Sequence, residues 1–176
     1  SLPATAAVED QPAAAKAAAD WIAAELDAAE PSFDLFGVAP ARADVVLALA
    51  SLGTRPGSAR RALIELRETA AAYIGEPATA GPLAKVLLAV LASGNDPDGF
   101  LPARDLEEEL RALAATDGSF SEDLYTQSLA VIALSRTSSG APAGAVDWLV
   151  SQQNDDGSWS NPFSPDAGDV DYTAAA

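Results

Sequence analysis

The sequence of 176 residues predicts an all-α fold with its helices in two layers. Three observations support this prediction. Apolar residues recur with a helical period in seven segments, and no stretch shows the period-two alternation of a strand. Wholly apolar helices alternate with amphipathic ones along the chain. A turn motif is repeated, and repeats of about 40–50 residues are typical of arrays of helical hairpins.

Each predicted helix has apolar residues spaced i, i+3, i+4 and i+7. Three of them also end near a glycine (Gly53, Gly75 and Gly94), which is the usual residue at a helix C-terminus. The predicted helices span 12–29, 42–52, 58–74, 81–92, 103–115, 123–135 and 141–153. An eighth helix begins in the last residues, at 169–176.

The helices at 42–52, 83–92 and 124–135 are almost wholly apolar, whereas the others carry charges on one side. A helix that is apolar all round must be buried, and a helix with a charged stripe faces water. This alternation predicts two concentric layers of helices, or stacked hairpins.

The repeat is clearest in its turns. Asp117-Gly118-Ser119-Phe120 matches Asp156-Gly157-Ser158-Trp159, 39 residues later, and Asp98-Gly99-Phe100 is a weaker copy. Tyr125-Thr126 then matches Tyr172-Thr173, 47 residues apart, so the later copy carries an insertion of eight residues, roughly NPFSPDAG. Asp-Gly allows the chain to turn after an outer helix. The aromatic residue should pack against that helix, and the Thr should open the next inner helix.

Composition excludes several classes of site. The chain has no Cys and no His, so it holds no Ser-His-Asp triad, no disulfide and no conventional zinc site. Its net charge of −16 argues against a nucleic acid or an anionic membrane surface as the partner. No apolar run is long enough to span a bilayer. The Asp-Gly turns are poor matches to a calcium loop and are interpreted as Asx turns, so we expect no metal and no cofactor.

The stretch Gln153 to Trp159 fits the pattern Q-x-x-x-G-x-W and resembles the repeat motif of the prenyltransferase and squalene-cyclase repeat family. The resemblance is good over 141–176 and loose over 41–176. It implies an α/α-toroid, in which inner helices are ringed by outer ones. Gln153, Gly157 and Trp159, with Asp117, Gly118 and Phe120 of the earlier copy, would then be structural residues of the repeat. About four hairpins would leave the ring incomplete and apolar inner helices exposed at one edge.

A second match concerns catalysis. Class II cyclases of this family carry D-x-D-D-T-A, whose middle Asp protonates an alkene or epoxide, and this chain reads Asp169-Val-Asp171-Tyr172-Thr173-Ala174. The resemblance implies Asp171 as the acid, supported by Asp169. The fourth position is Tyr172 instead of Asp, which removes a carboxylate expected to tune the acid. The competing interpretation makes both aspartates N-cap and first-turn residues of a helix.

Three functions follow as hypotheses. The first is a non-catalytic binding or scaffold domain, with an unidentified small-molecule or protein ligand in a cup formed by the inner-helix N-termini and turns. The second is a terpene-cyclase-like enzyme, and the third is a structural repeat domain that binds another protein or a second copy through its open edge. Protein prenyltransferases are excluded because their zinc site needs Cys and His. Transcobalamin-like and intrinsic-factor-like carriers share the toroid, so the motif indicates fold rather than function.

The ends of the chain carry two further predictions. Residues 1–11 are small and polar and are expected to be flexible, ahead of a repeat domain over 12–176. The first residue is Ser1, and small residues of this kind remain after removal of a signal peptide, which indicates export to the cell envelope or outside the cell. An artificial chain boundary is the alternative explanation for the small residues at this end. Because a helix only begins at 169–176, the native chain is expected to continue.

Overall fold

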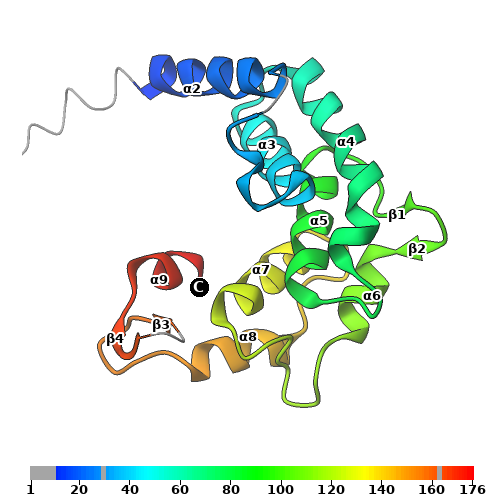
Figure 1. Cartoon of the computed structure of the whole chain (residues 1–176). Helices are drawn as coiled ribbons and strands as arrows, with labels where there is room; N and C mark the ends of the chain where they lie inside the picture. The colour runs from blue at the N-terminus through cyan, green and yellow to red at the C-terminus, as the bar shows by residue number, and fades with distance from the viewer. Residues whose placement is uncertain (1–10, 29–30, 162–163) are drawn as a thin grey trace, which may run out of the picture.

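The computed structural model describes residues 11–28, 31–161 and 164–176, and this part of the chain is mostly helical (Figure 1). The all-α prediction is confirmed at this level. Most of the predicted segment 1–11 lies outside the described residues. The helices are α2 (Gln11–Leu26), η1 (Asp34–Phe36, a 3-10 turn), α3 (Val38–Leu52), α4 (Pro56–Ile74), α5 (Ala80–Ala92), α6 (Leu106–Ala112), α7 (Leu124–Ser135), α8 (Ala143–Ser151) and α9 (Val170–Ala175).

Two short hairpins correct the expectation that no strand forms. Strand β1 (Asp98–Leu101) pairs antiparallel with β2 (Arg104–Asp105), and β3 (Ser160–Asn161) pairs antiparallel with β4 (Ser164–Gly168). These strands are too short to show an alternation in sequence. The second hairpin occupies the predicted insertion.

The hairpin of β1 and β2 also shortens the fifth predicted helix, which was expected from residue 103. Ala103 has a positive φ of 58°, which turns the chain between the two strands and is incompatible with a helix. The helix α6 begins only at Leu106, after Asp105 accepts hydrogen bonds from the backbone N–H groups of Glu107 and Glu108. Asp105 is therefore an N-cap residue.

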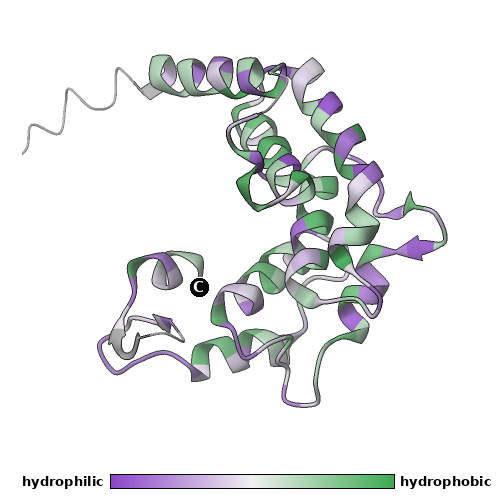
Figure 2. Ribbon diagram, viewed as in Figure 1, coloured by the Kyte–Doolittle hydropathy of each residue, from purple (hydrophilic) through white to green (hydrophobic). Residues whose placement is uncertain are grey.

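The helices are arranged in two layers along an open arc, with α2 and α9 at its two ends (Figure 1). The apolar helices α3, α5 and α7 pack side by side in that order. Of the outer helices, α4 contacts α3 and α5, α6 contacts α5, and α8 contacts α7. Figure 2 shows the contrast that the sequence predicts, since α5 and α7 are largely hydrophobic while α4 and α6 carry hydrophilic residues. An ion pair between Lys85 of α5 and Asp44 of α3 joins the first halves of two inner helices.

The core is built largely from Ala and Leu. Small residues such as Ala43, Ala84 and Ala130 are fully buried, which allows the inner helices to approach one another closely. The inner helices are nevertheless not buried all round, contrary to the expectation for wholly apolar helices. Leu52 of α3 is 40 % exposed and Ile132 of α7 is 38 % exposed. The inner layer therefore keeps partly exposed apolar side chains in the described part of the chain.

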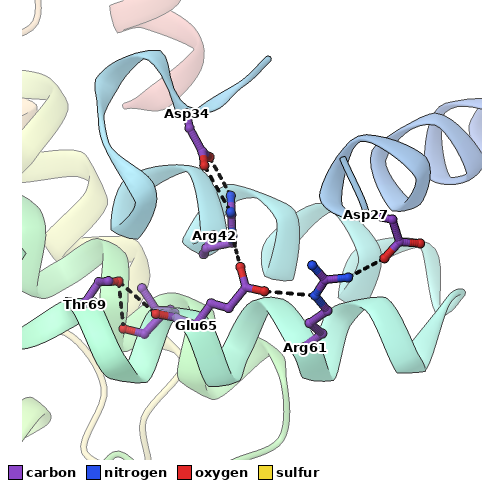
Figure 3. A network of polar contacts seen from close by, with 7 residues as sticks. Asp27, Asp34, Arg42, Arg61, Glu65 and Thr69 are labelled. Carbon is purple, nitrogen blue, oxygen red and sulfur yellow. Dashed lines mark hydrogen bonds and ion pairs between the residues drawn. The ribbon is translucent and has the colours of Figure 1, made fainter. Parts of the chain in front are cut away.

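A buried arginine fixes the start of the inner layer (Figure 3). Arg42 of α3 is 4 % exposed and donates hydrogen bonds to Asp34 of η1 (2.5 and 3.1 Å) and to Glu65 of α4 (2.5 Å). Glu65 also accepts a hydrogen bond of 2.9 Å from Arg61, which in turn pairs with Asp27. The network joins the end of the α2 segment to η1, α3 and α4. A buried charge without such partners would be strongly destabilising.

This network predicts a pH-dependent contribution to stability. Burial alone would raise the pKa of Glu65, but hydrogen bonds from Arg42 and Arg61 outweigh it and lower the pKa below the ordinary value of 4.5. A carboxyl group with a lowered folded-state pKa stabilises the fold above its unfolded pKa, and this contribution disappears as the pH falls through the folded pKa. We expect Glu65→Gln to lower the free energy of unfolding by about 2 kcal/mol at pH 7.

The measurement is urea unfolding of both proteins between pH 7 and pH 3. The difference between them should shrink below pH 4.5, the ordinary pKa of this group. Glu68→Gln, on an exposed position of the same helix, serves as the control and should leave the stability unchanged. A Glu65→Gln difference that stays constant down to pH 3 would contradict the assignment.

Candidate functional site

The two predicted copies of the turn have the same hydrogen bonds. Asp117 accepts from the backbone N–H and the hydroxyl of Ser119 at 3.0 and 2.7 Å, and Asp156 accepts from Ser158 at 3.0 and 2.6 Å. These bonds lower the pKa of both aspartates. The turns are Asx turns 39 residues apart, as the sequence predicts.

The glycine in each copy has a positive φ, 92° at Gly118 and 86° at Gly157, which favours Gly over residues with a Cβ. Gly118 has a second constraint, because a Cβ atom there would overlap the backbone carbonyl of Gly144 at the start of α8. The turn therefore lies directly against the next outer helix. Gly157 has no such contact, and its nearest neighbour would be Nε2 of Gln153 at 3.8 Å.

Side chains of the repeat motif tie the second turn to its helices. Gln153 donates to the carbonyl of Gly157 at 2.8 Å, which closes the turn. The Trp159 indole donates to the carbonyl of Leu149 at the end of α8 at 3.0 Å, as expected of an aromatic residue packing on the preceding helix. The backbone N–H of Trp159 donates to the hydroxyl of Thr173 at 2.9 Å. Gln153 and Trp159 thus hold the turn against α8 and the start of α9.

The first copy uses a buried glutamine that the sequence analysis did not single out. Gln127 of α7 is 0 % exposed, and its amide accepts from the N–H of Phe120 at 2.7 Å and donates to the carbonyl of Ala145 in α8 at 3.0 Å. One side chain thus joins the turn, the inner helix and the outer helix. An amide side chain in a helix predicted to be buried is the signal that could have identified it, because a buried amide needs hydrogen-bond partners.

These contacts correct the alignment of the two inner-helix starts. Asp123 and Asp169 are the N-cap residues of α7 and α9, and the side chains that bind the turn, Gln127 and Thr173, each lie four residues further on. The equivalent positions are therefore 46 residues apart, not 47, and the insertion has seven residues. Tyr172 corresponds to Thr126, so the shared Tyr-Thr pair is not a repeat feature.

The residues of the D-x-D-D-T-A match lie at the start of α9. Asp169 accepts hydrogen bonds from the N–H groups of Asp171 and Tyr172 at 2.9 and 3.1 Å. The backbone hydrogen bond from Tyr172 is the main cause that lowers the pKa of Asp169, and the side-chain hydrogen bond from Asn161 is the second. Asp169 is thus ionised at neutral pH. Asp171 lies in the first turn of α9, and its side chain is exposed.

Tyr172 connects α9 to α7. Its hydroxyl donates to Oδ1 of Asp123 at 3.0 Å, and its ring meets Tyr125 edge to face with the centroids 6.3 Å apart. Burial, followed by the hydrogen bond to Asp123, raises the pKa of Tyr172. Burial alone would raise the pKa of Asp123, but its hydrogen bonds with Thr126 and Tyr172 lower it. This pair fixes the start of α9 beside the start of α7.

The third, weaker copy does not form the same turn. Asp98, Gly99 and Phe100 belong to strand β1, and the Asx bond at this point is made by Asp96, which accepts from the N–H of Asp98 at 3.0 Å. Phe100 is buried, like Phe120. No group of three or more metal-ligating side chains occurs in the described part of the chain, and none of its helices is long and apolar enough to cross a membrane.

Among the hollows that the described residues form, three lie next to the inner layer. The predicted cup at the inner-helix N-termini corresponds to the smallest, about 400 Å³ between the starts of α5 and α7. A hollow of about 770 Å³, the inner-face hollow, lies at the C-terminal halves of α3, α5 and α7. A cleft of about 730 Å³, the α3–α4 cleft, lies at the C-terminal end of α3, between α4 and the end of α5. The larger hollows are thus at the opposite ends of the inner helices from the predicted cup.

The inner-face hollow is mainly apolar. It is lined by residues from the C-terminal halves of α3 and α5, from α7 and from Arg136, which follows α7: Leu47, Ala48, Ala50, Ser51, Leu88, Leu91, Ala92, Ile132 and Arg136. The sequence contained a signal for it, because helices that are apolar all round carry more apolar surface than two neighbours and an outer layer can cover.

No protein-family model, curated protein or solved structure matches this chain. The resemblance to the cyclase repeat family therefore depends on the two short motif matches in the sequence.

The close approach of Gly118 predicts a large difference between two equivalent glycines. We expect Gly118→Ala to lower the free energy of unfolding by about 3 kcal/mol, because it adds an overlap with the Gly144 backbone to the strain of a positive φ. Gly157→Ala is the matched control and should cost about 1 kcal/mol, from the φ alone. Thermal and urea unfolding of both variants measure this difference. Equal losses would show that the turn does not pack on α8.

Proposed function

We propose that this chain is a non-catalytic binding domain with the architecture of part of an α/α-toroid, as the resemblance to the prenyltransferase and squalene-cyclase repeat family implies. Its ligand would be a small apolar molecule held on the inner face of α3, α5 and α7. Export of the domain stays a prediction.

The inner-face hollow is the observation that carries this proposal. About 770 Å³ is within the range of small-molecule sites, roughly 300–1,000 Å³, and its lining is mostly apolar with one charged group. The exposed or half-buried side chains Leu47, Leu88 and Ile132 lie on this face. Uncovered apolar surface of this kind favours binding, because a ligand that covers it removes it from water.

The placement of the two aspartates supports a binding role over the cyclase alternative. Protonating an alkene requires a strong acid in an apolar cavity, with a proton that it can donate. Asp171 is exposed to water on α9, and it does not line the inner-face hollow. Asp169 has a lowered pKa and accepts backbone hydrogen bonds as an N-cap residue. Both aspartates fit the helix-capping interpretation.

Binding of the neutral fluorescent probe N-phenyl-1-naphthylamine tests the proposal. We expect saturable binding by the full chain with a stoichiometry of one. Ser51→Trp should fill the hollow and weaken binding by about ten-fold or more, because an indole occupies the space of the probe. Ser51 is exposed, so the substitution leaves the core in place.

A matched pair of variants locates the probe. Ile132→Ser removes an apolar side chain from the hollow and should weaken binding, whereas Val150→Ser removes a more exposed one from α8 and should have no effect. Circular dichroism checks that each variant is folded. Absence of saturable binding, or equal binding by wild type and Ser51→Trp, would refute the proposal.

One observation favours the alternative of a protein-binding repeat domain. Leu35 and Phe36 are neighbours on η1 and are 84 % and 91 % exposed, near the α2 end of the arc. If this patch binds a second copy, sedimentation velocity should show concentration-dependent association, and Leu35→Ser with Phe36→Ser should abolish it. Val150→Ser again serves as the control. A monomer at all concentrations would exclude self-association.

A further inference from the structure

The basic residues of this acidic chain fall into two groups. Seven of the ten form ion pairs with carboxylates: Lys16, Arg42, Arg55, Arg61, Lys85, Arg104 and Arg111. The other three, Arg60, Arg67 and Arg136, have no carboxylate partner among the described residues. With 26 acidic side chains in the sequence, an unpaired arginine is the exception.

All three unpaired arginines border the two large hollows. Arg60 and Arg67 line the α3–α4 cleft, and Arg136 lines the inner-face hollow. The two hollows adjoin, since Ala50 and Ala92 line both. The positive charges that are free of carboxylates are thus gathered at the C-terminal ends of the inner helices.

The α3–α4 cleft combines these charges with an apolar wall. Arg60 and Arg67 lie seven residues apart on α4, which places them about 10 Å apart along one side of the helix. Leu63 and Ile64 lie between them and also line the cleft. The guanidinium of Arg67 lies 5.9 Å from the ring centroid of Phe100, so an aromatic face rather than a carboxylate holds it in place.

We propose that the α3–α4 cleft binds a single-chain aliphatic carboxylate, with its chain on the apolar wall and its carboxylate between Arg60 and Arg67. A guanidinium matches a carboxylate in geometry and can donate two hydrogen bonds to it. This site lies outside the inner-face hollow and does not depend on the function proposed for that hollow.

The surroundings favour an amphiphile over a small inorganic anion. The C-terminal ends of α3 and α5 line the cleft through Gly53 and Ser93, and a helix C-terminus carries a partial negative charge. The net charge of −16 also repels anions at long range. An inorganic anion would have to overcome the helix C-termini and the net charge through its contacts with two exposed arginines alone. An aliphatic chain adds the burial of apolar surface, which is independent of charge.

Isothermal titration of the full chain with sodium dodecanoate, below its micelle concentration, tests the proposal. We expect one saturable site, with Arg60→Gln and Arg67→Gln each weakening binding by about five- to ten-fold, as for a lost charge-assisted hydrogen bond. Arg61→Gln is the matched control on the same helix, because Arg61 is paired with Asp27 and Glu65 and does not line the cleft. It should bind dodecanoate within about two-fold of wild type, which is the scatter expected of a surface charge.

Two further measurements separate the outcomes. Dodecanol has the same chain without the charge, and in the Ser51→Trp variant, whose inner-face hollow is filled, it should bind at least about ten-fold more weakly than dodecanoate. Ser51→Trp should retain dodecanoate binding, since Ser51 lines only the inner-face hollow, and this separates the present site from the one proposed above. Equal binding of dodecanol by Ser51→Trp, or wild-type affinity in both Arg60→Gln and Arg67→Gln, would overturn the proposal. So would an equal loss in Arg61→Gln, because it would indicate attraction by overall charge only.

Discussion

The burial of three apolar helices against one another constrains everything else in this structure. α3, α5 and α7 have too few polar residues to face water, so each must pack between its neighbours and an outer helix. Alanines at their contacts, among them Ala43, Ala84 and Ala130, allow this packing at short range. The outer helices then supply the charged surface of the chain. The arc in Figure 1 follows from repeating this arrangement along the sequence.

Polar contacts fix how each outer helix meets the inner layer. Gln127 joins a turn, an inner helix and an outer helix through one buried amide, and Thr173 makes the corresponding contact to the next turn. At the α2 end of the arc, Arg42 has the same function with charged partners from η1 and α4. Because buried polar groups cost free energy when they lose a partner, these contacts specify one arrangement among the many that apolar packing allows.

The hollows follow from the same burial requirement. Apolar helices in a layer are covered on their sides and by the outer layer, but α3, α5 and α7 leave apolar side chains only partly covered at the inner-face hollow. Ile132, which lines this hollow, is exposed for this reason. The unpaired Arg60, Arg67 and Arg136 lie around the ends of that layer, where helix C-termini attract positive charge. The large hollows and the unpaired arginines are therefore found at the same end of the inner layer.

The sequence by itself determined the helical class, the position of nearly every helix and the two Asx turns, because periodicity, glycine stops and Asp-Gly pairs act over a few residues. It also indicated the N-cap role of Asp169. Only the tertiary structure decided that Gln127 and Thr173 make the equivalent contacts to their preceding turns, which moved the alignment of the repeat by one residue. It also decided that Ala103 turns a hairpin where a helix was expected. These outcomes, like the position of the hollows, depend on contacts between segments far apart in the chain, which local patterns do not contain.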